Sequence, residues 1–203
     1  MNSAIPLLVL AFGLVTRSFA AEPEAKTISL PEVKPADAWT YVFSELPSRR
    51  VVTEFSQEVS KVDATSIVVN MRRGDAKPDE IKYGRDWLQT GDFRVYDFPL
   101  ELGKTWSYTR SYSSRQCGPS TDELTAEVKG WEDVEVPAGK FRALKIEHNG
   151  TYKGSCGTGV KQHWYWYVPA VKRHVKYEQH VFERPGGDMT VGELIVLKNY
   201  TVQ

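Results

Sequence analysis

The sequence predicts an all-β protein, built as a single curved antiparallel sheet or a half-open β-barrel with one disulfide. The first observation is segment 134–141, in which Pro137 and Gly139 suit a tight reversal between two strands. The second is the run of aromatic residues at 164–168, which is typical of a strand. The third is that no amphipathic helical stretch longer than about two turns follows the N-terminal segment.

Further strands are predicted where β-branched and aromatic residues alternate with polar ones. The charged segment 72–80 contains Gly74 and Pro78 and is expected to be a loop between two runs of strands. Short strands are expected after this loop at 81–83, 87–88 and 93–96. The other predicted strands are 38–43, 50–59 and 64–71, which form a meander, and then 105–112, 123–134, 140–148, 162–168, 172–182 and 189–202.

The N-terminal residues have the pattern of a secretory signal peptide. An apolar run at 5–15, short for a membrane span, precedes Ser18 and Ala20, the small residues that signal peptidase requires. We expect cleavage after Ala20 and a mature protein that is periplasmic or secreted. An uncleaved membrane anchor is the alternative, since no Lys or Arg precedes the apolar run. No transmembrane segment is expected in the mature chain.

The predicted organisation is a signal peptide at 1–20, an extended N-terminal segment at 21–37 and a single β domain at 38–203. Without the signal peptide, the 203-residue chain retains 183 residues, which is enough for one domain with a core. The chain has 26 basic and 26 acidic residues and a formal net charge of zero. Because no basic block or stripe occurs, nucleic acid is not expected as a partner.

Cys117 and Cys156 are the two cysteines of the chain, and each is followed by a glycine. In an oxidising compartment an isolated even pair predicts a disulfide. In the chain-entropy model such a bridge contributes about 4 kcal/mol to stability. A redox-active pair is disfavoured, because it would need closely spaced thiols or surroundings that lower a thiol pKa.

Three segments together resemble a widespread group of exported bacterial proteins of unknown function. The segments are 98–108, 134–146 and 164–176, and they contain the motifs V-x-V-P-A-G-x-F and W-Y-x-P-x-V. The resemblance implies an architecture similar to the open, half-closed β-barrels of lipoprotein carriers. It implies no activity, since the group has no catalytic residues to carry over.

The aromatic strand holds the candidate ligand-binding residues. Strict alternation places His163, Tyr165 and Tyr167 on one face of the strand and Trp164 and Trp166 on the other. Most aromatic residues on a strand pack in the core or cover the surface of the sheet. One set could instead line a concave cavity or stack on a sugar ring, and the strand pairing that decides this cannot be read from the sequence.

The histidines do not form a metal site in this interpretation. The chain contains His148, His163, His174 and His180. On a strand from 172 onward, His174 and His180 would share one face with Lys176 and Glu178. They would stand about 20 Å apart along that face, too far to bind one ion. A site that combines His163 with His174 across a hairpin is the alternative, but no metal and no cofactor are expected.

Catalytic residues are not assigned. Ser155 lies among glycines, but the strand, turn and helix arrangement that activates an exposed serine is missing. Glu132, Asp133 and Glu135 form an acidic cluster, yet alternation splits them between two faces and nothing visible would raise the pKa of one. The protein is therefore expected not to be an enzyme.

Two hypotheses about function remain. The first is a non-enzymatic secreted or periplasmic binding protein that holds a lipid or another apolar or amphipathic ligand on an aromatic concave sheet. The second is a structural or interaction protein that docks an envelope protein and has no small-molecule ligand. An empty volume beside Tyr165 and Tyr167 would favour the first hypothesis, and bulky side chains in that volume would favour the second.

Overall fold

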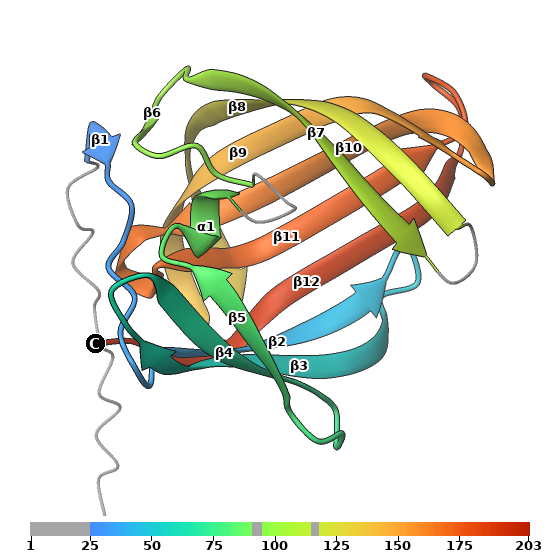
Figure 1. Cartoon of the computed structure of the whole chain (residues 1–203). Helices are drawn as coiled ribbons and strands as arrows, with labels where there is room; N and C mark the ends of the chain where they lie inside the picture. The colour runs from blue at the N-terminus through green and yellow to red at the C-terminus, as the bar shows by residue number, and fades with distance from the viewer. Residues whose placement is uncertain (1–24, 91–94, 115–117) are drawn as a thin grey trace, which may run out of the picture.

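One large antiparallel sheet dominates the computed structural model, which describes residues 25–90, 95–114 and 118–203 (Figure 1). In the order of the sheet its strands are β5 (Asp79–Gly84), β4 (Ser66–Arg73), β3 (Arg50–Val62), β2 (Ala38–Glu45), β12 (Met189–Thr201), β11 (Arg173–Phe182), β10 (Gly157–Val168), β9 (Gly139–Gly154), β8 (Gly118–Val136) and β7 (Thr105–Ser114). The sheet is curved, and its edge strands β5 and β7 are not paired with each other. The prediction of an all-β fold with one curved antiparallel sheet is confirmed, and the sheet is not closed into a barrel.

The predicted strands agree with the observed ones mainly in their centres. The meander of β2, β3 and β4 is present, and β7 to β12 occur in the predicted order. The main difference is at 149–161, where β9 and β10 continue to a turn at residues 155–156. Polar residues there hide the alternation, but the backbone still gains ladder hydrogen bonds from a neighbouring strand. The predicted signal peptide and its cleavage site lie outside the described residues.

The turn between β8 and β9 is the tight reversal that the sequence predicts. Val136 pairs with Gly139, which leaves Pro137 and Ala138 at the corner. The Ala138 N–H donates a hydrogen bond to the carbonyl oxygen of Leu197 in β12, 3.0 Å away. The β8–β9 hairpin is therefore fixed to a strand that is not its neighbour in the sheet.

The connection from β5 to β7, residues 85–104, crosses the open side of the curved sheet (Figure 1). It contains the short helix α1 (Trp87–Thr90) and strand β6 (Leu100–Glu101), which pairs with β1 (Thr27–Ile28). The prediction of a strand at 87–88 is therefore wrong. The Trp87 ring instead packs against Tyr83 and Trp39, with centroid separations of 5.1 and 6.4 Å. The strand predicted at 93–96 falls partly outside the described residues, and Tyr96 is not in a strand.

Strand β11 contains a β-bulge at Val175, where its register with β10 shifts. The extra residue turns His174 toward the interior, where its ring lies 5.4 Å from that of Tyr41. His180 lies on the outer face, 5.0 Å from the ring of Trp164. The expectation that the two histidines share one face is wrong, because an inserted residue reverses the alternation.

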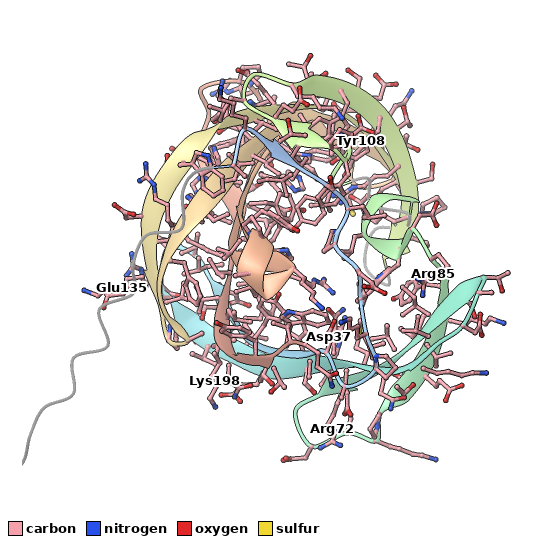
Figure 2. The ribbon with its side chains drawn as sticks, turned by 90° about the vertical axis from the view of Figure 1, so that its left-hand side faces the viewer. Asp37, Arg72, Arg85, Tyr108, Glu135 and Lys198 are labelled. Atoms are coloured by element: carbon pink, nitrogen blue, oxygen red, sulfur yellow. The ribbon has the colours of Figure 1, made fainter. Side chains whose placement is uncertain are left out.

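Side chains from all parts of the sheet fill its interior (Figure 2). Figure 2 shows Tyr108 inside the ring of strands, whereas Glu135 and Lys198 project outward. The largest fully buried apolar side chains are Trp39, Tyr41, Tyr167, Ile67, Leu100, Leu144, Ile146 and Leu197. Among the residues that the structure describes, no helix has the length and apolar character needed to cross a membrane.

Cys156 lies in the turn between β9 and β10, whereas Cys117 lies outside the described residues. The register pairs Ser120 with Gly154, so the start of β8 runs beside this turn. A Cβ atom built on Gly118 would lie 3.6 Å from the hydroxyl oxygen of Ser155. The residues that flank the two cysteines are therefore close together, and the disulfide itself stays a prediction.

Candidate functional site

The five candidate residues of the aromatic strand lie on two different surfaces. His163, Tyr165 and Tyr167 face the interior, where they are 0%, 6% and 0% exposed. Trp164 and Trp166 lie on the outer face of β10. The structure thus brings three of the five together and separates the two tryptophans from them.

The two outer tryptophans are engaged by neighbouring charged side chains. The indole N–H of Trp164 donates to Glu147 at 2.9 Å, and that of Trp166 donates to Glu132 at 2.8 Å. The Lys176 ammonium lies 4.1 Å from the centroid of the Trp166 ring, a cation–π contact. These contacts satisfy the indoles and identify their role as packing on the outer face.

Tyr165 and Tyr167 are covered by the connection between β5 and β7. The Tyr96 ring lies 6.3 Å from that of Tyr165 and 5.1 Å from that of Tyr167. The Phe98 ring lies 5.7 Å from that of Tyr167. At this part of the concave face, Tyr96 and Phe98 therefore occupy the position where the sequence analysis considered a ligand.

Three histidines of the interior each pair with a tyrosine hydroxyl through Nδ1. The pairs are His148 with Tyr108 at 2.8 Å, His174 with Tyr96 at 2.9 Å and His163 with Tyr177 at 3.3 Å. The Nε2 atom of His163 is buried without a hydrogen-bond partner. The alternative of a metal held by His163 and His174 does not fit, since the register places His174 opposite Tyr167, four residues along β10 from His163.

These histidines are neutral at pH 7. Burial lowers the pKa of His148 and of His174 to about 3, and it lowers the pKa of His163 well below its ordinary value. The nearby charge of Arg110 adds to the lowering for His148 and His163. An imidazole that binds protons so weakly is a poor general base near neutral pH, so the pairs serve as a hydrogen-bonded packing layer.

A charged cluster lies beside the histidines, formed by Arg110, Asp122 and Lys161. Arg110 Nε donates to Asp122 at 2.7 Å, and Lys161 Nζ lies 2.9 Å from both carboxylate oxygens of Asp122. Tyr112 accepts a further hydrogen bond from Lys161 at 2.6 Å. Asp122 is fully buried, so its charge is compensated entirely by these partners.

Burial also raises the pKa of the nearby Glu193, against the opposite effect of Lys161 and Arg110.

The other half of the concave face carries apolar rings that are only partly buried. Phe55 stacks on Tyr41 at a centroid separation of 5.3 Å, and Tyr83 stacks on Trp87 at 5.1 Å. Phe55, Tyr83, Trp87 and Ile195 pack against the core but keep accessible surface. This is where the interior retains apolar surface that its own side chains do not cover.

Two surface grooves lie away from this face. One, of about 470 Å³, is lined by polar and apolar residues of β8, β9 and β10, including Thr121, Tyr152 and Val160. The other, of about 400 Å³, adjoins Trp166 and Lys176 on the outer face. Within the described part of the chain, no three His, Cys, Asp or Glu side chains are grouped so that they could hold a metal ion.

Several residues of the interior were not found from the sequence. The interior position of Tyr108 and Arg110 follows from the alternation within β7. Asp122 and Lys161 also alternate with less buried neighbours, but only the pairing of β7, β8, β9 and β10 brings their charges together. A search that paired inward-facing charges across predicted hairpins could have found part of this cluster.

Comparisons with known proteins support the fold alone. No protein-family model matches the chain, and a search of curated proteins finds no match. The chain is similar to the crystal structure of an inferred exported protein with a YmcC-like fold from Bacteroides fragilis, with a TM-score of 0.55 and 12% identity, over 86% of this chain and 99% of that one. It is also similar to an inferred lipoprotein from Parabacteroides distasonis, with a TM-score of 0.56 and 14% identity, over 88% and 100% of the two chains. The fold of this chain is therefore similar to that of two bacterial proteins.

The charged cluster predicts a strong contrast between two aspartates. Asp122→Asn removes the buried carboxylate that pairs with Arg110 and Lys161, and we expect it to lower the free energy of unfolding by about 3 to 5 kcal/mol. Asp133→Asn is the control, because its partner Arg142 and its own side chain are solvent-exposed. Urea unfolding of both variants measures the difference, and equal small losses would contradict the structural role of Asp122.

Acidification from pH 7 to pH 5 is expected to lower the stability. Below pH 6.5 the unfolded chain binds protons that the three buried histidines do not bind in the folded state. The loss is about 2 kcal/mol per histidine at pH 5, and the full stability is present above pH 6.5. Glu193 acts in the opposite direction, because its pKa is raised.

Urea unfolding at the two pH values, with NMR titration of the imidazoles, tests this expectation. Imidazole resonances of His148, His163 and His174 that titrate near pH 6.5 in the folded protein would contradict it. So would equal stability at pH 7 and pH 5.

Proposed function

We propose that the protein is a non-enzymatic binding protein of the cell envelope, which holds an apolar or amphipathic ligand on the concave face of the sheet. The observation that carries the proposal is the set of partly buried rings on the β2 to β5 half of that face. Phe55, Tyr83 and Trp87 each stack on a neighbouring ring and keep one part accessible. Apolar surface of this kind, on a curved sheet with an open side, is suited to a hydrocarbon chain.

The envelope location rests on separate support. The N-terminal sequence has the pattern of a signal peptide, which implies a periplasmic or secreted protein. The two similar solved structures are described as an exported protein and a lipoprotein. A non-enzymatic role agrees with the interior chemistry, where histidines are neutral and the buried carboxylate of Asp122 is paired with two cations.

A second candidate is an interaction protein of the envelope without a small-molecule ligand. The observation that favours it is the covering of Tyr165 and Tyr167 by Tyr96 and Phe98. If the chain's own side chains also fill the rest of the concave face in solution, the sheet would serve as a rigid support for a docking surface.

The deciding experiment is native mass spectrometry of the mature protein purified from the periplasm under mild conditions, followed by organic extraction. A bound mass that is lost on extraction is the expected result. Tyr83→Ala should then weaken rebinding about tenfold, since it removes a stacked ring at the site. Tyr200→Ala is the control, because Tyr200 is an exposed ring that packs on Phe141.

The opposite result has an equally clear meaning. A protein that carries no extra mass, and that remains unchanged after incubation with lipid extracts, would contradict ligand binding. Crosslinking in intact cells would then test for a protein partner.

Export into an oxidising compartment also predicts the Cys117–Cys156 disulfide. Denatured, unreduced protein should show no free thiol in a colorimetric titration. Reduction should lower the free energy of unfolding by about 4 kcal/mol, because the unfolded chain regains conformational freedom. Two free thiols per chain in the unreduced sample would show that the cysteines are not paired.

A further inference from the structure

Arg173, the first residue of β11, places a guanidinium group in an aromatic part of the interior. Its central carbon lies 5.2 Å from the centroid of Trp39 and 4.7 Å from that of Trp87. The Nε and Nη1 atoms are buried and have no hydrogen-bond partner among the residues that the structure describes. Two aromatic rings thus stabilise the cation, while N–H donors at its edge remain unused.

A second unused donor lies close by. Within the described part of the chain, the buried hydroxyl of Tyr167 has no hydrogen-bond partner, and Tyr167 is 0% exposed. Burial raises the pKa of this hydroxyl, against the opposite effect of the Arg173 charge, so it keeps its proton and can donate. Buried polar groups are nearly always hydrogen-bonded, so two unsatisfied groups together point to an acceptor that is not part of the described chain.

The acidic partner of the neighbouring Lys172 is already engaged. Asp37 accepts hydrogen bonds from Lys172 Nζ at 2.8 Å and from the backbone N–H groups of Lys34 and Gln203, each at 2.8 Å. Among the described residues no carboxylate forms an ion pair with Arg173. Arg110 differs in this respect, since the same interior supplies Asp122 as its partner.

The surroundings of Arg173 define what kind of anion would fit. Trp87 stacks on Tyr83, and Tyr41 stacks on Phe55, so partly buried rings extend from the guanidinium along the concave face. His174 adds no positive charge, because burial and the Arg173 charge together lower its pKa to about 3. A single cation at the end of an apolar surface matches a molecule with one anionic group and a hydrocarbon tail.

We propose that Arg173 and the Tyr167 hydroxyl bind the anionic group of an amphiphile, a carboxylate or phosphate, whose hydrocarbon chain lies against Phe55, Tyr83 and Trp87. This inference rests on the proposed binding function and names the ligand class of the same site. The guanidinium N–H groups and the hydroxyl donate to the anionic oxygens, which satisfies the donors that the chain leaves unpaired.

Three ligands with one tail and different head groups test the proposal: dodecanoate, dodecyl phosphate and dodecanol. Isothermal titration calorimetry of the mature protein should show at least one of the two anions binding tenfold or more tightly than the alcohol, and the stronger anion identifies the head group. Acetate and inorganic phosphate, which lack the tail, should show no measurable binding at the same concentrations.

Substitution of Arg173 tests whether this residue causes the preference for anions. Arg173→Gln should reduce anion binding to the level of dodecanol and leave dodecanol binding unchanged. Arg72→Gln is the control, because Arg72 is exposed on the outside of the sheet and should leave all affinities unchanged (Figure 2). If Arg173→Gln does not fold, Tyr167→Phe and the wild-type preference for anions decide the question.

The outcomes separate this proposal from the broader one. Equal affinity for dodecanol and both anions would overturn the role of Arg173 while leaving the proposed function in place. Binding of none of the three, together with a clean mass after mild purification, would overturn both. An anion preference that both Arg173→Gln and Tyr167→Phe retain would place the anion elsewhere.

Discussion

The packing of Tyr96 and Phe98 on Tyr165 and Tyr167 is the contact on which the open sheet depends. A curved sheet whose edge strands do not meet would otherwise expose apolar side chains on its concave side. The connection of residues 85–104 leaves one edge strand, crosses the open side and enters the other edge strand. Its aromatic rings therefore cover part of the interior, whereas Phe55, Tyr83 and Trp87 on the β2 to β5 half keep accessible surface.

Polar groups in this interior are of two kinds. Most are satisfied within the chain: Asp122 has two cations, and each of three histidines has a tyrosine hydroxyl. Among the described residues, buried donors of Arg173 and Tyr167 have no hydrogen-bond partner, and neither do the Nε2 atoms of His148 and His163, although each of these two rings bonds a tyrosine through Nδ1. Arg110 is paired with a buried carboxylate, so its charge stabilises the fold. Arg173 is instead surrounded by aromatic rings, and we propose that its charge binds a ligand. This contrast connects the packing of the sheet to the class of ligand proposed.

The accuracy of the sequence predictions depended on how local the determining interactions are. Alternation located the strands, and Pro137 with Gly139 located the β8–β9 turn, because both depend on neighbouring residues. The same alternation gave the correct faces for His163 and Trp164 but failed for His174, where one extra residue at Val175 shifts the register. The strand expected at 87–88 is a helix turn, since packing on Tyr83 and Trp39 outweighs local propensity.

The sequence by itself determined the all-β class, the antiparallel order of the hairpins and the division of the aromatic strand into two faces. These features follow from the two-residue period of a strand and from turn chemistry, which act over a few residues. Only the tertiary structure decided that Tyr96 covers Tyr165, that Asp122 pairs with both Arg110 and Lys161, and that Arg173 forms no ion pair with a carboxylate of the described residues. Each of these outcomes depends on strand register and on the curvature of the sheet, which bring together residues that lie far apart in the chain.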